Sequence, residues 1–136
     1  GRTRRTEKDE GRVLQEAFSE LREALSKKSG TVIWDGTCLD QRARSIVSRI
    51  GRNYAAAVTI ASFDVPAEIA WDRNMSRGED RIPMAWFGAA AERREYPAPH
   101  EAHGIMSIDA AGNVMPVYEA DEDVLRVRMD QEAPTP

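Results

Sequence analysis

The stretch TVIWDGTCLDQRAR, from Thr31 to Arg44, decides the expected fold of this 136-residue chain. Its first residues are β-branched or aromatic, and they run without a polar interruption into an acid at Asp35. A short, continuous apolar run of this kind is typical of a strand covered on both faces in a parallel sheet. We therefore predict a buried strand over Thr31–Asp35, followed by a loop that contains Gly36 and Thr37 and leads into a helix.

Helical and strand patterns alternate along the rest of the chain. Apolar residues recur at helical spacing from Glu7 to about Lys28, and Gly30 ends that helix. This alternation predicts an α/β fold, with a mostly parallel sheet built from right-handed crossovers. The further predicted elements are helices at Asp40–Ile50, Pro66–Arg77 and Pro83–Glu95, and strands at Ala55–Phe63, 105–109 and 114–118, the last an edge strand because it contains Pro116.

Composition and charge favour a single domain with an acidic tail. Apolar residues make up 41% of the chain and charged residues 31%, which is ordinary for a globular protein. From Glu119 onward there are six acidic and two basic residues, so the net charge of −4 lies there. We predict one domain over residues 1–118 and a disordered tail over 119–136. A neutral body argues against nonspecific DNA binding, so any nucleic-acid contact would be local.

Two further features bear on where the chain works. The longest mostly apolar run, Tyr54–Ala61, is far too short to span a membrane, so no membrane partner is expected. Cys38 is the sole cysteine, which forms no disulfide within the chain and is compatible with a reducing, cytoplasmic location.

Two predicted strands end in an acid, at Asp35 and Asp64. Ligands of α/β sheets bind beyond the carboxyl ends of the strands. A carboxylate at Asp35 can hold a hydrated magnesium ion or accept a proton from a hydroxyl. Gly36 lets the backbone approach a ligand, and the Thr37 hydroxyl can donate to a phosphate. The alternative is that Asp35 simply caps the loop before the helix at Asp40.

A second group of candidate residues lies in the stretch RNMSRGEDR. Arg73 and Arg77 are four residues apart on one helical face, and Arg81 follows in a loop. Guanidinium groups in this arrangement can grip a polyphosphate and offset charge on a transferring phosphoryl group. The alternative is a solvated face, paired with the neighbouring acids Asp72, Glu79 and Asp80.

Other polar groups carry weaker signals. The HEAH stretch, with His100 and His103, is a poor zinc motif because it lacks an evident third ligand. Glu101 within it is expected to accept backbone hydrogen bonds. Four arginines around the second helix either line a nucleic-acid groove or form a solvated face: Arg42, Arg44, Arg49 and Arg52.

Four stretches in series resemble the P-loop kinases of the polynucleotide 5′-hydroxyl kinase type: VIWDGTCLDQRAR, AAVTIASFDVPAEIAWDRNMSRGE, IPMAWFGAAAERR and YPAPHEAHGIMSI. The resemblance covers roughly residues 10 to 110. It implies a partial P-loop kinase-like, three-layer α/β fold with a mostly parallel sheet and a helical lid. It also implies transfer of the terminal phosphate of ATP to a hydroxyl, most often the 5′-hydroxyl of a polynucleotide.

The resemblance assigns roles to three residues. Asp35 would be the catalytic, strand-tip acid near Mg²⁺ and its metal ligand. Arg73 and Arg77 would be the lid arginines that contact ATP phosphates, with Arg77 also catalytic. Thr37 is a further candidate ATP-binding residue because of its hydroxyl and not because of the resemblance. The chain departs from the family pattern at Cys38, where asparagine is usual.

The larger departure is that the 136 residues contain no Gly-Lys-Ser or Gly-Lys-Thr phosphate-binding loop; the stretch Lys27–Gly30 has the wrong order. The preferred interpretation is the carboxyl-terminal part of such a kinase, with the loop supplied by a missing N-terminal part or a partner chain. The 136 residues alone are then expected to transfer nothing. The alternatives are a non-catalytic binding or regulatory module on a kinase-derived scaffold, and a kinase for a small molecule.

Overall fold

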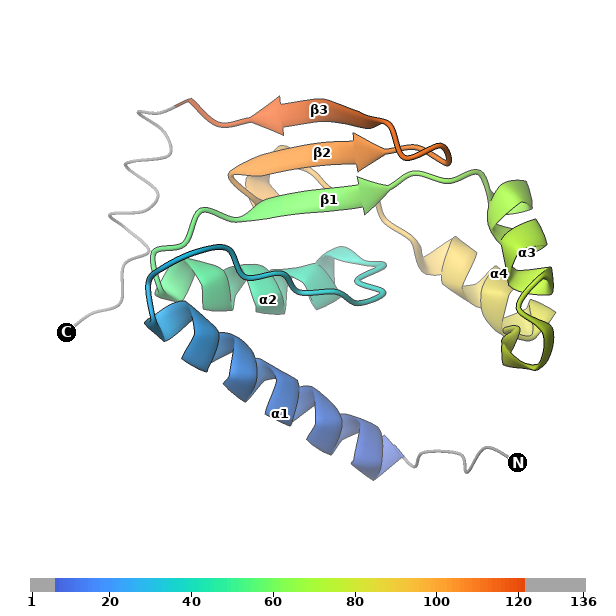
Figure 1. Cartoon of the computed structure of the whole chain (residues 1–136), viewed down its shortest axis with the longest axis horizontal. Coiled ribbons are helices and arrows are strands. Elements are labelled where there is room, and N and C mark those ends of the chain that lie inside the picture. Colours follow the sequence, from blue (N-terminus) through green and yellow to red (C-terminus); the bar gives the residue numbers. More distant parts are fainter. Residues whose placement is uncertain (1–6, 122–136) are drawn as a thin grey trace.

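The structure is a computed structural model that describes residues 7–121. Its three-stranded sheet has the order β1 (Thr59–Phe63), β2 (Gly104–Ile108) and β3 (Val114–Glu119) (Figure 1). β1 and β2 are parallel, and β3 is antiparallel to β2. The remaining elements are the α-helices α1 (Glu7–Ser26), α2 (Gln41–Asn53), α3 (Ala67–Met75) and α4 (Met84–Arg93), and two 3₁₀ turns, η1 (Gly78–Asp80) and η2 (Pro99–Glu101).

The predicted α/β fold class is confirmed. Parallel neighbours need a long crossover, and here α3, η1, α4 and η2 connect β1 to β2. In Figure 1 the pair α3 and α4 lies beyond the carboxyl end of β1, away from α1 and α2. β3 is an edge strand as predicted, and its Pro116 lies opposite Met106, beside an irregularity in the register.

The predicted strand at Thr31–Asp35 is wrong for the chain as described. These residues are extended but belong to no strand, and Ile33 is 84% exposed. A strand forms when a neighbour accepts and donates its backbone hydrogen bonds, and no strand of residues 7–121 pairs with this segment. The local sequence correctly predicted an extended backbone. Strand pairing, however, needs a neighbouring strand, which residues 7–121 do not provide for this segment.

One side chain of this segment is nevertheless anchored in the core. Phe18 and Leu21 of α1 pack against Ile50 of α2, and all three are buried. The ring of Trp34 stacks on Phe18, with the centroids 5.2 Å apart and the planes 13° from parallel. Apolar burial and ring stacking therefore fix the segment against α1 and α2, even without a strand partner.

Helix α2 is defined by its two ends. The Asp40 carboxylate accepts a hydrogen bond from the Ala43 amide at 2.8 Å, as expected for an N-cap residue. At the other end Gly51 lies so close to the start of β1 that a Cβ atom there would be 2.9 Å from Val58 Cγ2. The absent side chain therefore allows α2 to approach β1.

Two further predictions concern the acidic tail and membrane-spanning segments. Of the predicted acidic tail, the part beyond Asp121 lies outside the described residues. Along the described chain, no helix combines the length and the apolar character that crossing a membrane requires.

Replacing Gly51 with alanine should destabilise the protein. The new methyl group would collide with the short, stiff Val58 side chain, at a cost of about 1–3 kcal/mol in the free energy of unfolding. Gly88 in α4 is the matched control, because no atom lies within 4 Å of its built Cβ. Gly88→Ala should instead stabilise by about 0.5–1 kcal/mol. Urea unfolding of both variants checks this, and equal effects would contradict the close approach.

Candidate functional site

The loop after the extended segment carries the predicted acid. Asp35 and Thr37 are both exposed, and the Asp35 carboxylate makes no hydrogen bond or ion pair with any residue that the structure describes. The alternative, in which Asp35 caps the loop that leads to α2, is not what the structure has, because its carboxylate accepts no hydrogen bond from that loop. Asp40 is the N-cap of α2, as predicted. Asp35 is therefore an exposed carboxylate two residues before an exposed threonine, and both side chains are accessible to an external ligand.

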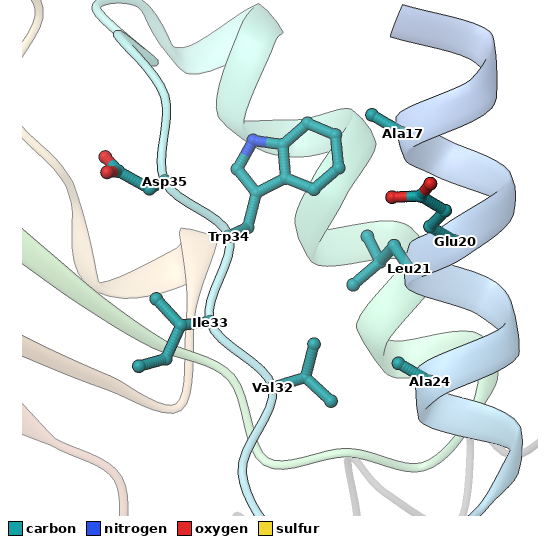
Figure 2. A pocket seen from close by; sticks show the side chains of 8 residues that line it. All are labelled: Ala17, Glu20, Leu21, Ala24, Val32, Ile33, Trp34 and Asp35. Atoms are coloured by element: carbon teal, nitrogen blue, oxygen red, sulfur yellow. The ribbon is translucent and has the colours of Figure 1, made fainter.

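Side chains of the segment alternate between two sides. Figure 2 shows Val32 and Trp34 directed towards α1, and Ile33 and Asp35 directed to the opposite side. Between the segment and α1 lies an open pocket of about 320 Å³. The residues that line it are Ala17, Glu20, Leu21, Ala24, Val32, Ile33, Trp34 and Asp35. The pocket contains neither predicted arginine, so it is not by itself the predicted nucleotide site.

The predicted arginines lie on a separate helical arm, which we define as residues 65–93. Trp71 and Phe87 meet edge to face across α3 and α4, with their centroids 5.1 Å apart. Asn74 is buried and exchanges two hydrogen bonds with the backbone of Ile82, each 2.8 Å long. These contacts hold the turn that contains Arg77 between the two helices. The sequence analysis did not single out Asn74, although its place between the two arginines was a usable signal.

The two arginines of the arm have different surroundings. Arg73 Nη2 donates a 2.7 Å hydrogen bond to the carbonyl oxygen of Ala110, in the turn between β2 and β3. Arg77 is exposed, and within residues 7–121 its side chain has no hydrogen bond or ion pair. Between Asp35 and either arginine the described structure has no direct contact. The structure thus places an acid and an arginine arm on the same chain without bringing them together.

A charged cluster closes the arm at its base. Asp64 directly precedes the arm and Arg94 directly follows it, and Arg94 Nη2 lies 2.5 Å from Asp64 Oδ1. Ser62 Oγ donates to the same carboxylate at 2.8 Å, and Ser107 Oγ donates to its other oxygen. Arg94 also donates to the Phe63 carbonyl at 3.0 Å. Asp64 is therefore a structural acid that joins the two ends of the arm, and the sequence analysis missed Arg94.

The cluster shifts the titration of Asp64. Partial burial raises the pKa of this carboxyl, but hydrogen bonds from Ser107 and Ser62 and the charge of Arg94 outweigh it, so the pKa is lowered from its ordinary 3.8. The carboxylate therefore stays ionised and paired at neutral pH.

The arginines of α2 divide into two kinds. Arg44 is buried, and Arg52 Nη2 donates to the carbonyl oxygens of His100 and Glu101 at 3.2 and 2.9 Å. Arg42 and Arg49 are exposed. Neither predicted alternative thus holds for Arg44, since a buried guanidinium is neither a groove lining nor a solvated face.

Both histidines of the HEAH stretch take part in contacts within the protein. His103 Nδ1 accepts a 2.8 Å hydrogen bond from the Val58 amide, and His100 Nε2 contacts Gln41 Nε2. Glu101 accepts a hydrogen bond from the Ala98 amide at 2.6 Å, as the sequence analysis expected. In the described part of the chain, no three histidine, cysteine, aspartate or glutamate side chains gather as a metal site.

A comparison with family models places this arrangement in a known family. A model described as AAA domain matches residues 1–97 of the chain. The chain belongs to the AAA domain family. The match spans the Asp35 loop, the arm and Arg94, and it supports a P-loop NTPase-like relationship. No curated protein and no solved structure matches the chain.

Loss of the Asp64 charge should weaken this AAA domain in a pH-dependent way. Because the folded pKa is lowered, the carboxylate stabilises the fold above the ordinary value of 3.8, and this contribution is lost as pH falls through the folded pKa. Asp64→Asn should cost about 1–2 kcal/mol at pH 7. Urea unfolding of both proteins at pH 7 and at a series of pH values that descends well below 3.8 measures this. A difference that does not shrink in acid would contradict the ionised pair.

Proposed function

We propose that this chain is part of an ATP-dependent phosphotransferase that transfers the terminal phosphate of ATP to a hydroxyl, and that a further segment completes the enzyme. The family match over residues 1–97 carries the proposal, because it covers both the Asp35 loop and the arginine arm. The finer assignment, a kinase acting on the 5′-hydroxyl of a polynucleotide, is supported by the resemblance in sequence.

Asp35 is proposed as the acid at the magnesium ion of the bound nucleotide. Magnesium sites in phosphotransferases commonly use one or two carboxylates and complete their coordination with water and phosphate oxygens. A single exposed carboxylate without an internal partner fits that requirement. When bound, the ion would neutralise charge on the phosphates. Thr37, two residues further on and also exposed, is proposed to donate its hydroxyl to a phosphate oxygen.

Arg73 and Arg77 are proposed to bind the phosphates from the arm. A guanidinium can donate two parallel hydrogen bonds to phosphate oxygens and keeps its charge at any relevant pH. Arg77 lies next to the η1 turn, and its position is supported by the Asn74–Ile82 hydrogen bonds. Arg73 would exchange the Ala110 carbonyl for a phosphate oxygen, which requires the arm to move. Such closure over a nucleotide would exclude water from the transfer.

The phosphate-binding loop is proposed to come from a segment outside these 136 residues. That segment would form a strand beside β1, with the loop at the carboxyl end of the strand. Two observations support this placement. β1 is the outer strand of the described sheet, and the backbone groups of Thr59, Ala61 and Phe63 face away from β2. The extended Thr31–Asp35 segment directs Ile33 and Asp35 away from α1, leaving them available to a neighbour (Figure 2). A strand between the two would pair with both.

Two classes of acceptor fit the surface of the chain. Arg42 and Arg49 remain exposed on α2 and can contact a nucleic-acid backbone. The neutral body is equally compatible with a small-molecule hydroxyl as acceptor. A non-catalytic binding module is a second candidate, favoured by the exposed side chains of Ile33 and Phe63, which are 84% and 64% exposed.

Phosphate transfer from labelled ATP tests the proposal. The 136-residue chain with Mg²⁺ and a 5′-hydroxyl oligonucleotide should show no turnover, since it lacks a phosphate-binding loop. The same chain extended by its upstream coding sequence should phosphorylate the oligonucleotide or a small-molecule hydroxyl. Turnover by the short chain would contradict the role of the added segment. If the extended chain transfers to no acceptor, the kinase assignment is wrong and the binding module is favoured.

In an active, extended chain, Arg77→Ala should lower kcat by roughly 100-fold or more, because the transferring phosphoryl group loses a charged hydrogen-bond donor. Arg77→Lys should restore activity only partly, since an ammonium cannot make the forked contact. Arg93→Ala is the matched control, an exposed arginine at the end of α4, and should have little effect. Equal activity of both Arg77 variants and the control would remove Arg77 from the mechanism.

A further inference from the structure

Arg44 connects three segments that are far apart in the sequence. Its side chain is 7% exposed although it carries a full charge. Arg44 Nη1 donates to the carbonyl oxygens of Cys38, Leu39 and Glu95 at 3.1, 3.2 and 2.8 Å. The first two carbonyls belong to the Asp35 loop, and the third belongs to the connection after α4. A single guanidinium nitrogen thus joins the loop to the end of the crossover.

Glu101 supplies the opposite charge. Arg44 Nε donates to Glu101 Oε1 at 2.8 Å and Nη2 donates to Oε2 at 3.3 Å, which is a forked, two-bond contact. The Glu101 side chain is 4% exposed. Burial raises its pKa, but the Arg44 hydrogen bonds and the Ala98 amide outweigh this and leave the pKa lowered. Both partners are therefore charged and buried, so removing either leaves an uncompensated charge.

The loop that this pair holds is constrained and tightly folded. Cys38 has a φ of 39°, a left-handed conformation that a residue with a side chain adopts at some cost. At Gly36 a Cβ atom would lie 3.3 Å from Trp34 Nε1 and 3.6 Å from Cys38 Sγ. The Glu95 amide donates a further 2.8 Å hydrogen bond to the Leu39 carbonyl. Such a backbone persists when surrounding contacts determine it, and Arg44 makes several of them.

We propose that Arg44 and Glu101 form a positioning pair that sets the conformation of the loop from Asp35 to Asp40, and with it the place of Asp35 and Thr37. The pair itself touches no ligand, because both side chains are buried. The conformational part of this inference stands on the contacts above. Its importance for phosphate transfer rests on the function proposed for Asp35 and Thr37.

Arginine is required at this position for a geometric reason. The planar guanidinium donates to Glu101 from one edge and to the three carbonyls from another nitrogen. Lysine would keep the charge but offers one nitrogen, which cannot reach the carboxylate and the carbonyls together. Arg44→Lys therefore separates the charge of the pair from its role in holding the loop.

Cys38 provides a probe of the loop in the unmodified chain. It is the sole cysteine, it lies in the loop, and its thiol is partly buried. The rate of alkylation by a maleimide reports how often the loop opens. Arg44→Lys should raise this rate by about tenfold. The raised rate should not change when a low concentration of urea is added, because the opening is local. Glu101→Gln, which keeps the shape of the side chain but leaves the Arg44 charge without its partner, should also raise it. Arg49→Lys, an exposed arginine on the same helix, should leave it unchanged.

Hydrogen exchange locates the effect. In Arg44→Lys, faster exchange should be confined to peptides that cover residues 35–40 and 95–101, while peptides from β1 and β2 keep their protection. An unchanged alkylation rate in a folded Arg44→Lys variant would overturn the proposal. A faster rate that rises steeply with urea, or faster exchange throughout the chain, would also overturn it, because the pair would then stabilise the whole fold and not the loop.

These measurements need neither nucleotide nor activity. A failure to bind or transfer phosphate would therefore contradict the proposed function and leave the loop result standing. An unchanged loop in Arg44→Lys would contradict the positioning pair alone.

Discussion

A strand needs a neighbour for its backbone hydrogen bonds, and this requirement explains the most unusual feature of the structure. Thr31–Asp35 has the composition of a buried strand, yet it remains extended and unpaired within residues 7–121. β1 likewise has one edge without a neighbouring strand in the described residues. The Gly104 amide donates to the Val58 carbonyl and the Asp64 amide donates to the Ile108 carbonyl, so even-numbered residues of β1 face β2. With a period of two, the amides of Thr59, Ala61 and Phe63 face away from β2.

The rest of the molecule is organised around the three-stranded sheet by contacts between charged groups. Arg44 and Glu101 join the Asp35 loop to the connection after α4. Asp64 and Arg94 join the two ends of the arm that carries Arg73 and Arg77. In each case one arginine brings together segments that are far apart in the sequence. The proposed function places a nucleotide between the loop and the arm, so both ionic contacts would act on the geometry of the same reaction.

Much of the fold could be predicted because its determinants are local. Asp40 caps α2, and Pro66 and Pro83 directly precede α3 and α4, so these helix starts follow from nearby residues. The edge position of β3 follows from Pro116. The absence of a strand partner for Thr31–Asp35 within residues 7–121 could not be predicted, because pairing depends on a neighbour and not on the segment itself. The Arg44–Glu101 and Arg94–Asp64 contacts were missed because the partners are 57 and 30 residues apart. For the candidate site, Asp35, Thr37, Arg73 and Arg77 remain predictions about a bound nucleotide.

Hydrogen exchange at individual β1 amides tests most directly whether a further strand completes the sheet. In the 136-residue chain the amides of Ile60 and Ser62 should be protected, while those of Thr59, Ala61 and Phe63 should exchange rapidly. In the chain extended by its upstream coding sequence, these three amides should become protected together with residues 32–35. If they exchange as rapidly in an extended, folded chain as in the short one, no strand lies beside β1 and the account is contradicted.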